Sequence, residues 1–303
     1  MAPDARMMSQ MTSKAGFVAA LDQSGGSTPA ALRLYGIADS DYSGDEEMFR
    51  LVHSMRVRIM TTPSFSGEKV IGAILFEKTM DGDVGGKAVP SYLWEDRAIV
   101  PFLKVDKGLA AEANGVQLMK PIPDLDALLE RAVSRGIFGT KMRSVIAYAD
   151  RSGIASVVRQ QFEIGKRILD HQLIPIIEPE VLVKSPTKQG AEAILLDEII
   201  RELDGLASGQ QVMIKVSIPT VPDFYKPLID HKSVVRVVAL SGGYSRIEAC
   251  EKLTHNQGMI ASFSRALTED LKATMTDAEF DSSLGRAIGQ IYSASVEKSP
   301  IGS

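Results

Sequence analysis

Several features are scarce in this chain of 303 residues, and each scarcity excludes a class of protein. The only cysteine, Cys250, can form no internal disulfide and leaves no thiolate cluster for zinc, which is typical of a reducing cytoplasm. The net charge is −4, so no overall basic field indicates a nucleic-acid partner. No segment approaches the ~20 consecutive apolar residues of a membrane-spanning helix, and the first residues lack the apolar stretch of a signal peptide. We therefore expect a soluble cytoplasmic protein that binds neither nucleic acid nor membrane.

Histidines are also few, and the four present show no spacing typical of a metal site or a catalytic triad. Surface positions or hydrogen-bonded core positions explain all four of them. We therefore expect no metal and no cofactor.

Apolar residues, by contrast, make up 45% of the chain, which is enough for a large core. They gather in short aliphatic runs that are apolar on both faces, as parallel strands covered by helices are. Eight such runs recur along the chain, at 16–22, 70–76, 98–104, 139–146, 173–179, 212–216, 234–240 and 258–263. The fourth run is half polar and is the least typical strand.

Helical stretches separate most of these runs. The stretch 45–60 opens with acidic residues, which suits a helix N-terminus, and 124–136 ends on a glycine, a usual helix stop. The segment 77–97 is Gly-rich and ambiguous, and 221–231 predicts a short helix at best. Further helices are expected at 154–172, 191–206 and 245–258.

Eight strands that alternate with helices predict a (β/α)8 TIM barrel of the α/β class. No linker, repeat or low-complexity segment divides the chain, so we expect a single domain over residues 1–303. The barrel would cover about 16–270, with extra terminal helices around it. A C-terminal helix and tail would occupy 276–303, and the last residues are expected to be loose.

Polar side chains follow or end most of the predicted strands. In TIM barrels the catalytic groups lie at the C-terminal ends of the strands, so this placement predicts a single functional rim. Seven of the eight strands contribute to it: Asp22, Lys104, Lys141 with Arg143, Glu178 with Glu180, Lys215, Ser241 with Gly242, and Ser264 with Arg265.

Two lysines within otherwise buried strands need an explanation, because an unpaired ammonium is rarely buried. Either Lys141 or Lys215 alone could be a lysine whose stem covers the edge of the core. Both together, with the acid Glu178 on the strand between, favour chemistry. Burial and a neighbouring ammonium are expected to lower a lysine pKa, and the free amine can form a Schiff base with a carbonyl.

Glycine-rich segments at two strand ends are weaker signals. The segment SGGYS (241–245) could be an ordinary tight turn, and Arg265 could lie on a solvated helix face. In TIM barrels, however, this position often builds a phosphate site from backbone N–H groups, to which an arginine could add a bidentate contact. A second phosphate could bind opposite, at Ser24, Ser27, Lys104 and Arg143.

Taken in order, these motifs resemble the class I, Schiff-base-forming fructose-1,6-bisphosphate aldolases, in particular their shorter bacterial branch. The resemblance extends from residue 16 to about 270. Its most specific feature is the combination of IIEPE, a later strand that carries a lysine, and LSGG. The matching stretches are AALDQSGGS (19–27), FLKVDKG (102–108), GTKMR (139–143), IIEPEVL (176–182), MIKVSIPTVP (213–222), ALSGGYS (239–245) and SFSRAL (262–267).

The resemblance implies a lyase that reversibly cleaves fructose 1,6-bisphosphate. It makes Lys215 the Schiff-base lysine, Glu178 the general acid and base, and Lys141 the cation that orients the substrate hydroxyls. Asp22 would handle the proton of the C4 hydroxyl, and Glu180 would be a supporting carboxylate. The C1 phosphate is assigned to Ser241, Gly242 and Arg265, and the C6 phosphate to Ser24, Ser27, Lys104 and Arg143.

The chain departs from the animal members of that family at three places. Gln23 replaces an acidic residue, and Ala31 replaces an arginine near the first phosphate loop. Those enzymes end in a tyrosine that helps to protonate the enamine, whereas this chain ends in Ile301-Gly302-Ser303. Another group or a water molecule is expected to perform that step.

Other readings stay open at this point. Another Schiff-base barrel, such as a transaldolase or a deoxyribose-phosphate aldolase, would need only one phosphate site. A barrel kept as a non-catalytic scaffold would not need the set of Lys215, Glu178 and Lys141. Small sugar phosphates are the expected partners, and a homo-oligomer is compatible with the sequence.

Overall fold

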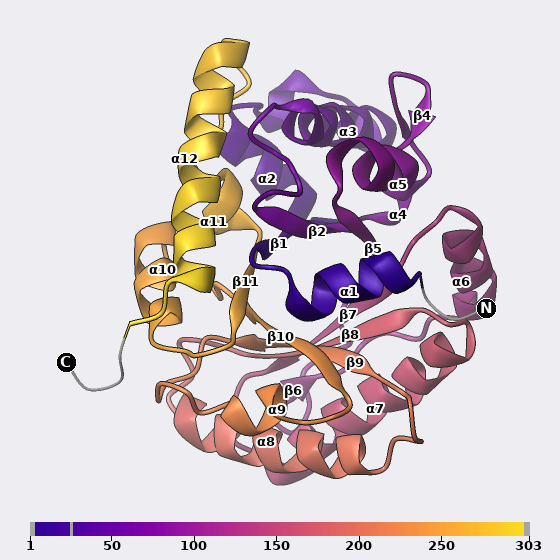
Figure 1. Ribbon diagram of the computed structural model, residues 1–303, viewed down its shortest axis with the longest axis vertical. Helices are drawn as coiled ribbons and strands as arrows, with labels where there is room; N and C mark the ends of the chain where they lie inside the picture. Colours follow the sequence, from indigo (N-terminus) through magenta and orange to yellow (C-terminus); the bar gives the residue numbers. More distant parts are fainter. Residues whose placement is uncertain (1–3, 25–26, 300–303) are drawn as a thin grey trace.

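The computed structural model describes residues 4–24 and 27–299, and its centre is a closed barrel of eight parallel strands (Figure 1). The strands lie around the barrel in sequence order, and the last of them closes it by pairing with the first. The predicted (β/α)8 fold is confirmed. The barrel strands are β1 (Phe17–Leu21), β2 (Val70–Leu75), β5 (Val100–Lys104), β7 (Gly139–Ile146), β8 (Ile174–Val181), β9 (Val212–Ser217), β10 (Val234–Leu240) and β11 (Ile260–Phe263).

Each of the eight apolar runs forms one of these strands, including the half-polar fourth run. That run becomes β7, which has eight residues and is as long as β8. Most of its polar residues are buried rather than solvated: Thr140 and Ser144 are fully buried, and Lys141 is nearly so. The polar content of β7 therefore reflects a barrel strand that carries functional side chains, not a weak strand.

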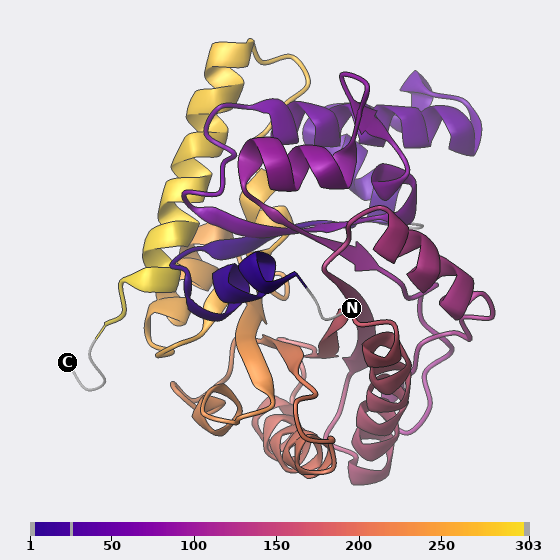
Figure 2. The same ribbon diagram turned by 45° about the vertical axis from the view of Figure 1, so that its right-hand side comes forward.

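Helices cover the outside of the barrel, and the five long stretches expected between strands are all helical (Figures 1 and 2). They are α3 (Gly44–Thr61), α6 (Leu125–Ser134), α7 (Arg151–Asp170), α8 (Lys188–Asp204) and α10 (Arg246–Thr254), followed by the expected C-terminal helix α12 (Asp277–Val296). None of the described helices is long and apolar enough to cross a bilayer.

Several short elements were not predicted. They are α1 (Ala5–Ser13), α2 (Ser27–Tyr35), the turn η1 (Asp39–Asp41), α11 (Arg265–Thr268), the strand β6 (Val116–Gln117), and the elements of the ambiguous 77–97 connection. That connection folds into α4 (Glu77–Met80), the hairpin β3 (Asp83–Val84) with β4 (Lys87–Ala88), α5 (Val89–Ser91) and the π-helical turn η2 (Tyr92–Asp96). Within 221–231 only α9 (Lys226–Ile229) is helical.

The helix α1 closes the N-terminal end of the barrel and lies across the strand starts in Figure 1. Its Met7 and Met11 pack into the apolar cluster that fills the barrel interior. The Gln10 amide donates to the backbone of Ile71 (2.8 Å), and Arg236 at the start of β10 donates to the carbonyl of Met11 (2.9 Å). This end of the barrel is therefore sealed, which leaves the C-terminal end for the substrate.

The interior of the barrel changes from apolar to charged along the strands. Because alternate residues of a strand share a face, the residue two positions after an interior side chain also points inward. Ile176 and Met213 belong to the interior apolar cluster, and Glu178 and Lys215 follow two residues later on the same strands. The sequence pattern of β8 and β9 thus carries two buried charges toward the barrel mouth.

Candidate active site

Four charged side chains form a continuous line of ion pairs at the C-terminal end of the barrel. Lys141 Nζ lies 2.5 Å from Asp22 Oδ2 and 3.1 Å from Glu178 Oε2, and Lys215 Nζ lies 3.0 Å from Glu178 Oε1. All four side chains are buried, with exposed fractions of 3% for each lysine and for Glu178 and 8% for Asp22. The structure therefore brings together four of the five predicted catalytic residues.

The strand register explains why Glu178 and Lys215 face each other. The ladder between β8 and β9 ends at the pair Ile177–Ile214, one residue before both side chains. The ladder between β7 and β8 continues to Ile146–Val181. β8 therefore remains fixed on one side while its separation from β9 leaves room for the Glu178–Lys215 pair.

The two charges at the start of this line stabilise each other. Burial by itself would raise the pKa of Asp22, but the ammonium groups of Lys141 and Lys215 hold that pKa far below its usual range. Burial likewise would lower the pKa of Lys141, but Asp22 and Glu178 raise it well above its ordinary value. The expectation that burial and a neighbouring ammonium lower a lysine pKa is therefore wrong for Lys141, because two carboxylates outweigh them.

This difference separates the two lysines chemically. Lys141 is held as an ammonium between Asp22 and Glu178, so it can donate hydrogen bonds but is a poor nucleophile. Among the described residues, Lys215 forms an ion pair only with Glu178, which can accept its proton. The geometry favours Lys215 as the amine that attacks a carbonyl and Glu178 as its proton partner.

The fifth predicted catalytic residue, Glu180, lies beside this line and not within it. Its Oε2 accepts from Arg143 Nε at 2.5 Å. Burial would lower the pKa of Arg143, but Glu180 and Glu178 raise it. The Arg143 side chain is still 38% exposed, so it lies at the open edge of the site, where an incoming anion could compete with Glu180 for it.

Lys104, another predicted phosphate ligand, is held by its own loop. Its Nζ lies 2.7 Å from Asp106 Oδ1 and also donates to the Asp106 carbonyl at 2.7 Å. Ser24 lies two residues beyond Asp22 at the same rim, and the side chain of Ser27 lies outside the described part of the chain. Asp106 is thus an ion-pair partner of Lys104.

The opposite side of the mouth is formed by the loop after β10 and by the start of α11. Gly242 has a φ of +60°, and a Cβ there would lie 2.4 Å from Val183 Cγ1, so only glycine fits without a shift. A Cβ on Gly243 would lie 3.7 Å from Arg265 Nη2, which places the Arg265 guanidinium against this loop. Ser241, the residue before Gly242, is buried. The structure thus brings Ser241, Gly242 and Arg265 together as predicted.

A buried arginine that the sequence did not single out supports the Asp22 end of the line. Arg56, on α3, donates to the carbonyl of Gln23 and to Thr79 Oγ1, the latter at 2.8 Å. Burial lowers the pKa of Arg56 to about 10. The Gln23 amide donates in turn to Ser264 Oγ at 2.6 Å, which ties the end of β1 to the end of β11. Arg56 lies among other charged residues of a helix, so no pattern distinguished it.

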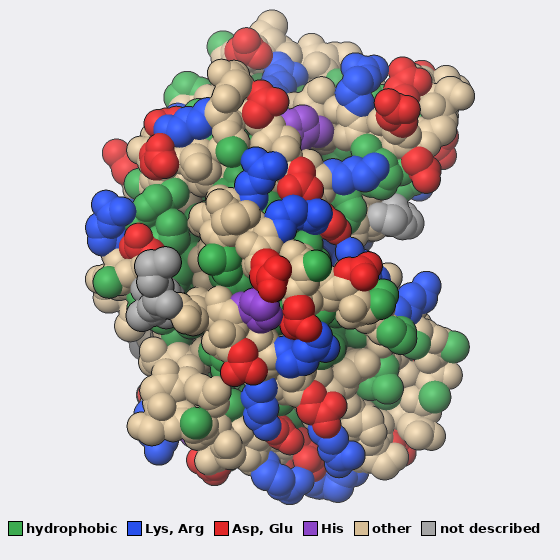
Figure 3. Space-filling model, turned by 90° about the vertical axis from the view of Figure 1, so that its right-hand side faces the viewer, with side chains coloured by type: hydrophobic (Ala, Val, Ile, Leu, Met, Phe, Trp, Pro, Cys, Tyr) green, Lys and Arg blue, Asp and Glu red, His purple; other side chains and the backbone are tan. Residues whose placement is uncertain are grey.

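The surface is deeply hollowed along one side in Figure 3, and Lys and Arg side chains lie near the hollow.

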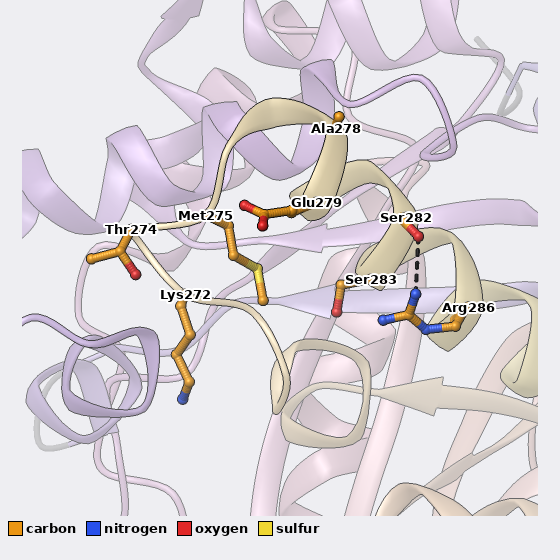
Figure 4. A pocket seen from close by; sticks show the side chains of 8 residues that line it. All are labelled: Lys272, Thr274, Met275, Ala278, Glu279, Ser282, Ser283 and Arg286. Atoms are coloured by element: carbon orange, nitrogen blue, oxygen red, sulfur yellow. Dashed lines mark hydrogen bonds between the residues drawn. The ribbon is translucent and has the colours of Figure 1, made fainter.

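A different hollow of about 680 Å3 lies beside the start of α12 (Figure 4), where Arg286 donates to Ser282 Oγ at 2.9 Å. Lys272 there donates to the Leu34 carbonyl (2.5 Å) and Glu279 accepts from Thr276, so these charges already support the fold. Within the described ranges, no three His, Cys, Asp or Glu side chains are grouped to hold a metal.

Comparisons with known proteins agree with one another. A family model described as fructose-bisphosphate aldolase class-I matches residues 7–193. The chain is 54% identical over 294 residues to a protein named fructose-bisphosphate aldolase class 1 from Synechocystis sp., covering 97% of this chain and 98% of that protein. It is 55% identical over 290 residues to a protein of the same name from Porphyromonas gingivalis, covering 96% and 98%.

A solved structure adds agreement on the fold alone. The fructose-bisphosphate aldolase of Plasmodium falciparum, crystallised with TRAP and a small-molecule inhibitor, matches 99% of this chain and 98% of its own with a TM-score of 0.73 and 20% identity. The family match covers more than half of the chain, and the two relatives span nearly all of it. The chain belongs to the class I fructose-bisphosphate aldolase family.

Proposed function

We propose that this chain cleaves fructose 1,6-bisphosphate reversibly to dihydroxyacetone phosphate and glyceraldehyde 3-phosphate, through a Schiff base on Lys215. The observation that supports this most strongly is the buried line of ion pairs from Asp22 through Lys141 and Glu178 to Lys215. It provides a nucleophile, a proton carrier and a fixed cation within one barrel mouth.

Schiff-base formation needs a proton to leave the lysine and later to reach the departing oxygen. Lys215 transfers a proton to Glu178, and the free amine attacks the C2 carbonyl of the open-chain sugar to give a carbinolamine. Glu178 then returns a proton to the C2 hydroxyl, which leaves as water, and the iminium forms. The 3.0 Å separation between Lys215 Nζ and Glu178 Oε1 is suited to both transfers.

Cleavage of the C3–C4 bond needs a base at the C4 hydroxyl. Asp22 is a carboxylate at neutral pH because Lys141 and Lys215 outweigh the effect of burial and keep its pKa low. It takes the hydroxyl proton as C4 becomes the aldehyde of glyceraldehyde 3-phosphate, and the electron pair of the broken bond moves into the iminium to form an enamine. Protonation at C3 and hydrolysis of the imine then release dihydroxyacetone phosphate.

Two phosphate sites would hold the ends of the substrate across the mouth. We assign the C1 phosphate to the Ser241–Gly242 loop and Arg265, and the C6 phosphate to Lys104 and Arg143 with the hydroxyls of Ser24 and Ser27. In this assignment Arg143 exchanges its contact with Glu180 for the phosphate. Glu180 is the supporting carboxylate that holds the guanidinium in place until the phosphate binds.

We further propose that residues 1–303 form one catalytic domain that works in the cytoplasm on small sugar phosphates, with no nucleic-acid or membrane partner. One closed barrel with its terminal helix packed on it supports the first part. The single cysteine supports the second.

A cleavage assay on matched substrates tests this proposal. The chain should cleave fructose 1,6-bisphosphate, and Lys215→Met should abolish turnover without changing the fold. The same preparation should have little activity on 2-deoxyribose 5-phosphate, and EDTA should have no effect. Preferred cleavage of the deoxy sugar would favour the deoxyribose-phosphate aldolase reading, and turnover by Lys215→Met would refute the Schiff-base lysine.

A further inference from the structure

A buried glutamine outside the barrel mouth holds the backbone of Glu178. Gln161 lies in the middle of α7 and is fully buried. Its Oε1 accepts from the Glu178 N–H at 2.8 Å, and its Nε2 donates to the Glu178 carbonyl at 3.1 Å. One amide side chain therefore satisfies both polar groups of a single residue.

This clamp acts at the place where the sheet opens. Glu178 lies one residue beyond the Ile177–Ile214 pair, at which the ladder between β8 and β9 ends. The next residue is Pro179, which has no N–H to donate. Glu178 is thus a buried residue without a ladder partner on β9, and Gln161 binds its backbone N–H and C=O.

The adjacent residue on the same helix makes the same kind of contact to a different target. Gln160 Oε1 accepts from the Met119 N–H at 2.9 Å, and its Nε2 donates to the Met119 carbonyl at 3.0 Å. Met119 contributes no polar side chain to the line of ion pairs. Two neighbouring glutamines therefore make nearly identical pairs of hydrogen bonds, and only one pair reaches the site.

We propose that Gln161 is a positioning residue for proton transfer between Lys215 and Glu178, an inference that rests on the proposed role of Glu178. The carboxylate of Glu178 must stay within hydrogen-bond reach of Lys215 at 3.0 Å and of Lys141 at 3.1 Å. The hydrogen bonds from Gln161 to the N–H and C=O of Glu178 fix the position of its Cα, from which the side chain extends. Misplacement of a reacting group by about 1 Å can cost roughly 10²-fold in rate, so a loosened peptide should slow the transfers.

The test compares Gln161→Met with Gln160→Met, since each removes two hydrogen bonds from α7 and keeps the side-chain length. Gln161→Met should lower kcat by about tenfold or more with little change in KM, and should slow borohydride-trappable Schiff-base formation with dihydroxyacetone phosphate by the same factor. Gln160→Met should stay within about twofold of wild type. Gln161→Asn keeps the amide on a shorter stem and should also slow trapping, which covers a folding failure of the methionine variant.

The outcomes separate this inference from the proposed function. Equal losses in the Gln160 and Gln161 variants, or an unchanged trapping rate in Gln161→Met, would overturn the positioning role. If Glu178→Gln is impaired while both Gln161 variants trap normally, only the positioning role falls. If Glu178→Gln itself traps and turns over normally, the proposed role of Glu178 falls first.

Discussion

Replacing Glu178 with glutamine keeps the shape of the side chain but removes its ability to carry a proton. In the structure its two oxygens face two ammonium groups, Lys215 at 3.0 Å and Lys141 at 3.1 Å. An amide at this position can still donate or accept a hydrogen bond, but it cannot take the proton of Lys215. The substitution therefore isolates proton transfer from positioning and size.

The expected magnitude follows from that single lost function. General acid–base catalysis typically contributes 10²–10⁴-fold, so kcat should fall by roughly that factor, equivalent to about 3–5 kcal/mol of barrier. The variant also leaves two buried ammonium groups with one carboxylate fewer, so a lower Tm is expected. Turnover must therefore be measured per folded molecule, below the unfolding transition.

The assay is steady-state cleavage of fructose 1,6-bisphosphate, with Glu198→Gln as matched control. Glu198 is a buried carboxylate on α8 that also lies between two cations, Arg151 at 3.0 Å and Arg201 at 2.6 Å. Its replacement should lower Tm and leave kcat within about twofold, since it touches no group that transfers a proton. A Glu178→Gln enzyme with nearly wild-type kcat would refute the proton-transfer role.

Three further predictions follow from the geometry of the site. Arg265→Ala should lower kcat/KM for fructose 1,6-bisphosphate and fructose 1-phosphate alike, by about one to two decades. Arg143→Ala should lower kcat/KM mainly for the bisphosphate, and equal losses on both sugars for this variant would refute two phosphate sites. The depressed pKa of Asp22 contributes stability that is present above the unfolded pKa of about 3.9 and is lost as the pH falls toward the folded pKa. The free energy of unfolding of the wild type should therefore fall more steeply than that of Asp22→Asn between about pH 5 and 2.5. Parallel pH dependences of the two free energies, measured by urea denaturation, would contradict this. Gly242→Ala should raise KM severalfold, because Gly242 has a φ of +60° and an added Cβ would clash with Val183. The control Gly209→Ala, at a φ of +85° with open space around it, should lose only about 1 kcal/mol of stability. Equal effects of the two variants on KM would argue against the loop's role in phosphate binding.

The eight strands could be predicted because their residues are apolar on both faces, a pattern that few other elements share. The helix α1 escaped prediction because it is short and Met-rich, and the packing of Met7 and Met11 into the barrel helps to stabilise it. The connection at 77–97 stayed ambiguous because its elements have two to five residues each. Elements that depend on tertiary contacts left no periodic signal.

The sequence could place the charged residues at one rim but not pair them. Which side chains meet depends on the stagger between strands, and this is why Arg143, opposite Glu178 in the ladder, contacts Glu180 instead. For the same reason a lowered pKa was wrongly predicted for Lys141. Its second carboxylate partner, Asp22, follows a strand that is far away in sequence, and this partner helps to raise the pKa instead. Gln161 could not be found at all, because nothing in the sequence distinguishes it from Gln160.

Borohydride trapping with dihydroxyacetone phosphate, followed by peptide mapping, tests the central claim that Lys215 carries the covalent intermediate. Lys215 has a single carboxylate partner among the described residues, whereas Lys141 is held as an ammonium by two. Reduction should therefore add one reduced triose phosphate to the peptide that contains Lys215, and Lys215→Met should remove the label. A label on Lys141 or Lys104, or trapping that survives in Lys215→Met, would contradict the account.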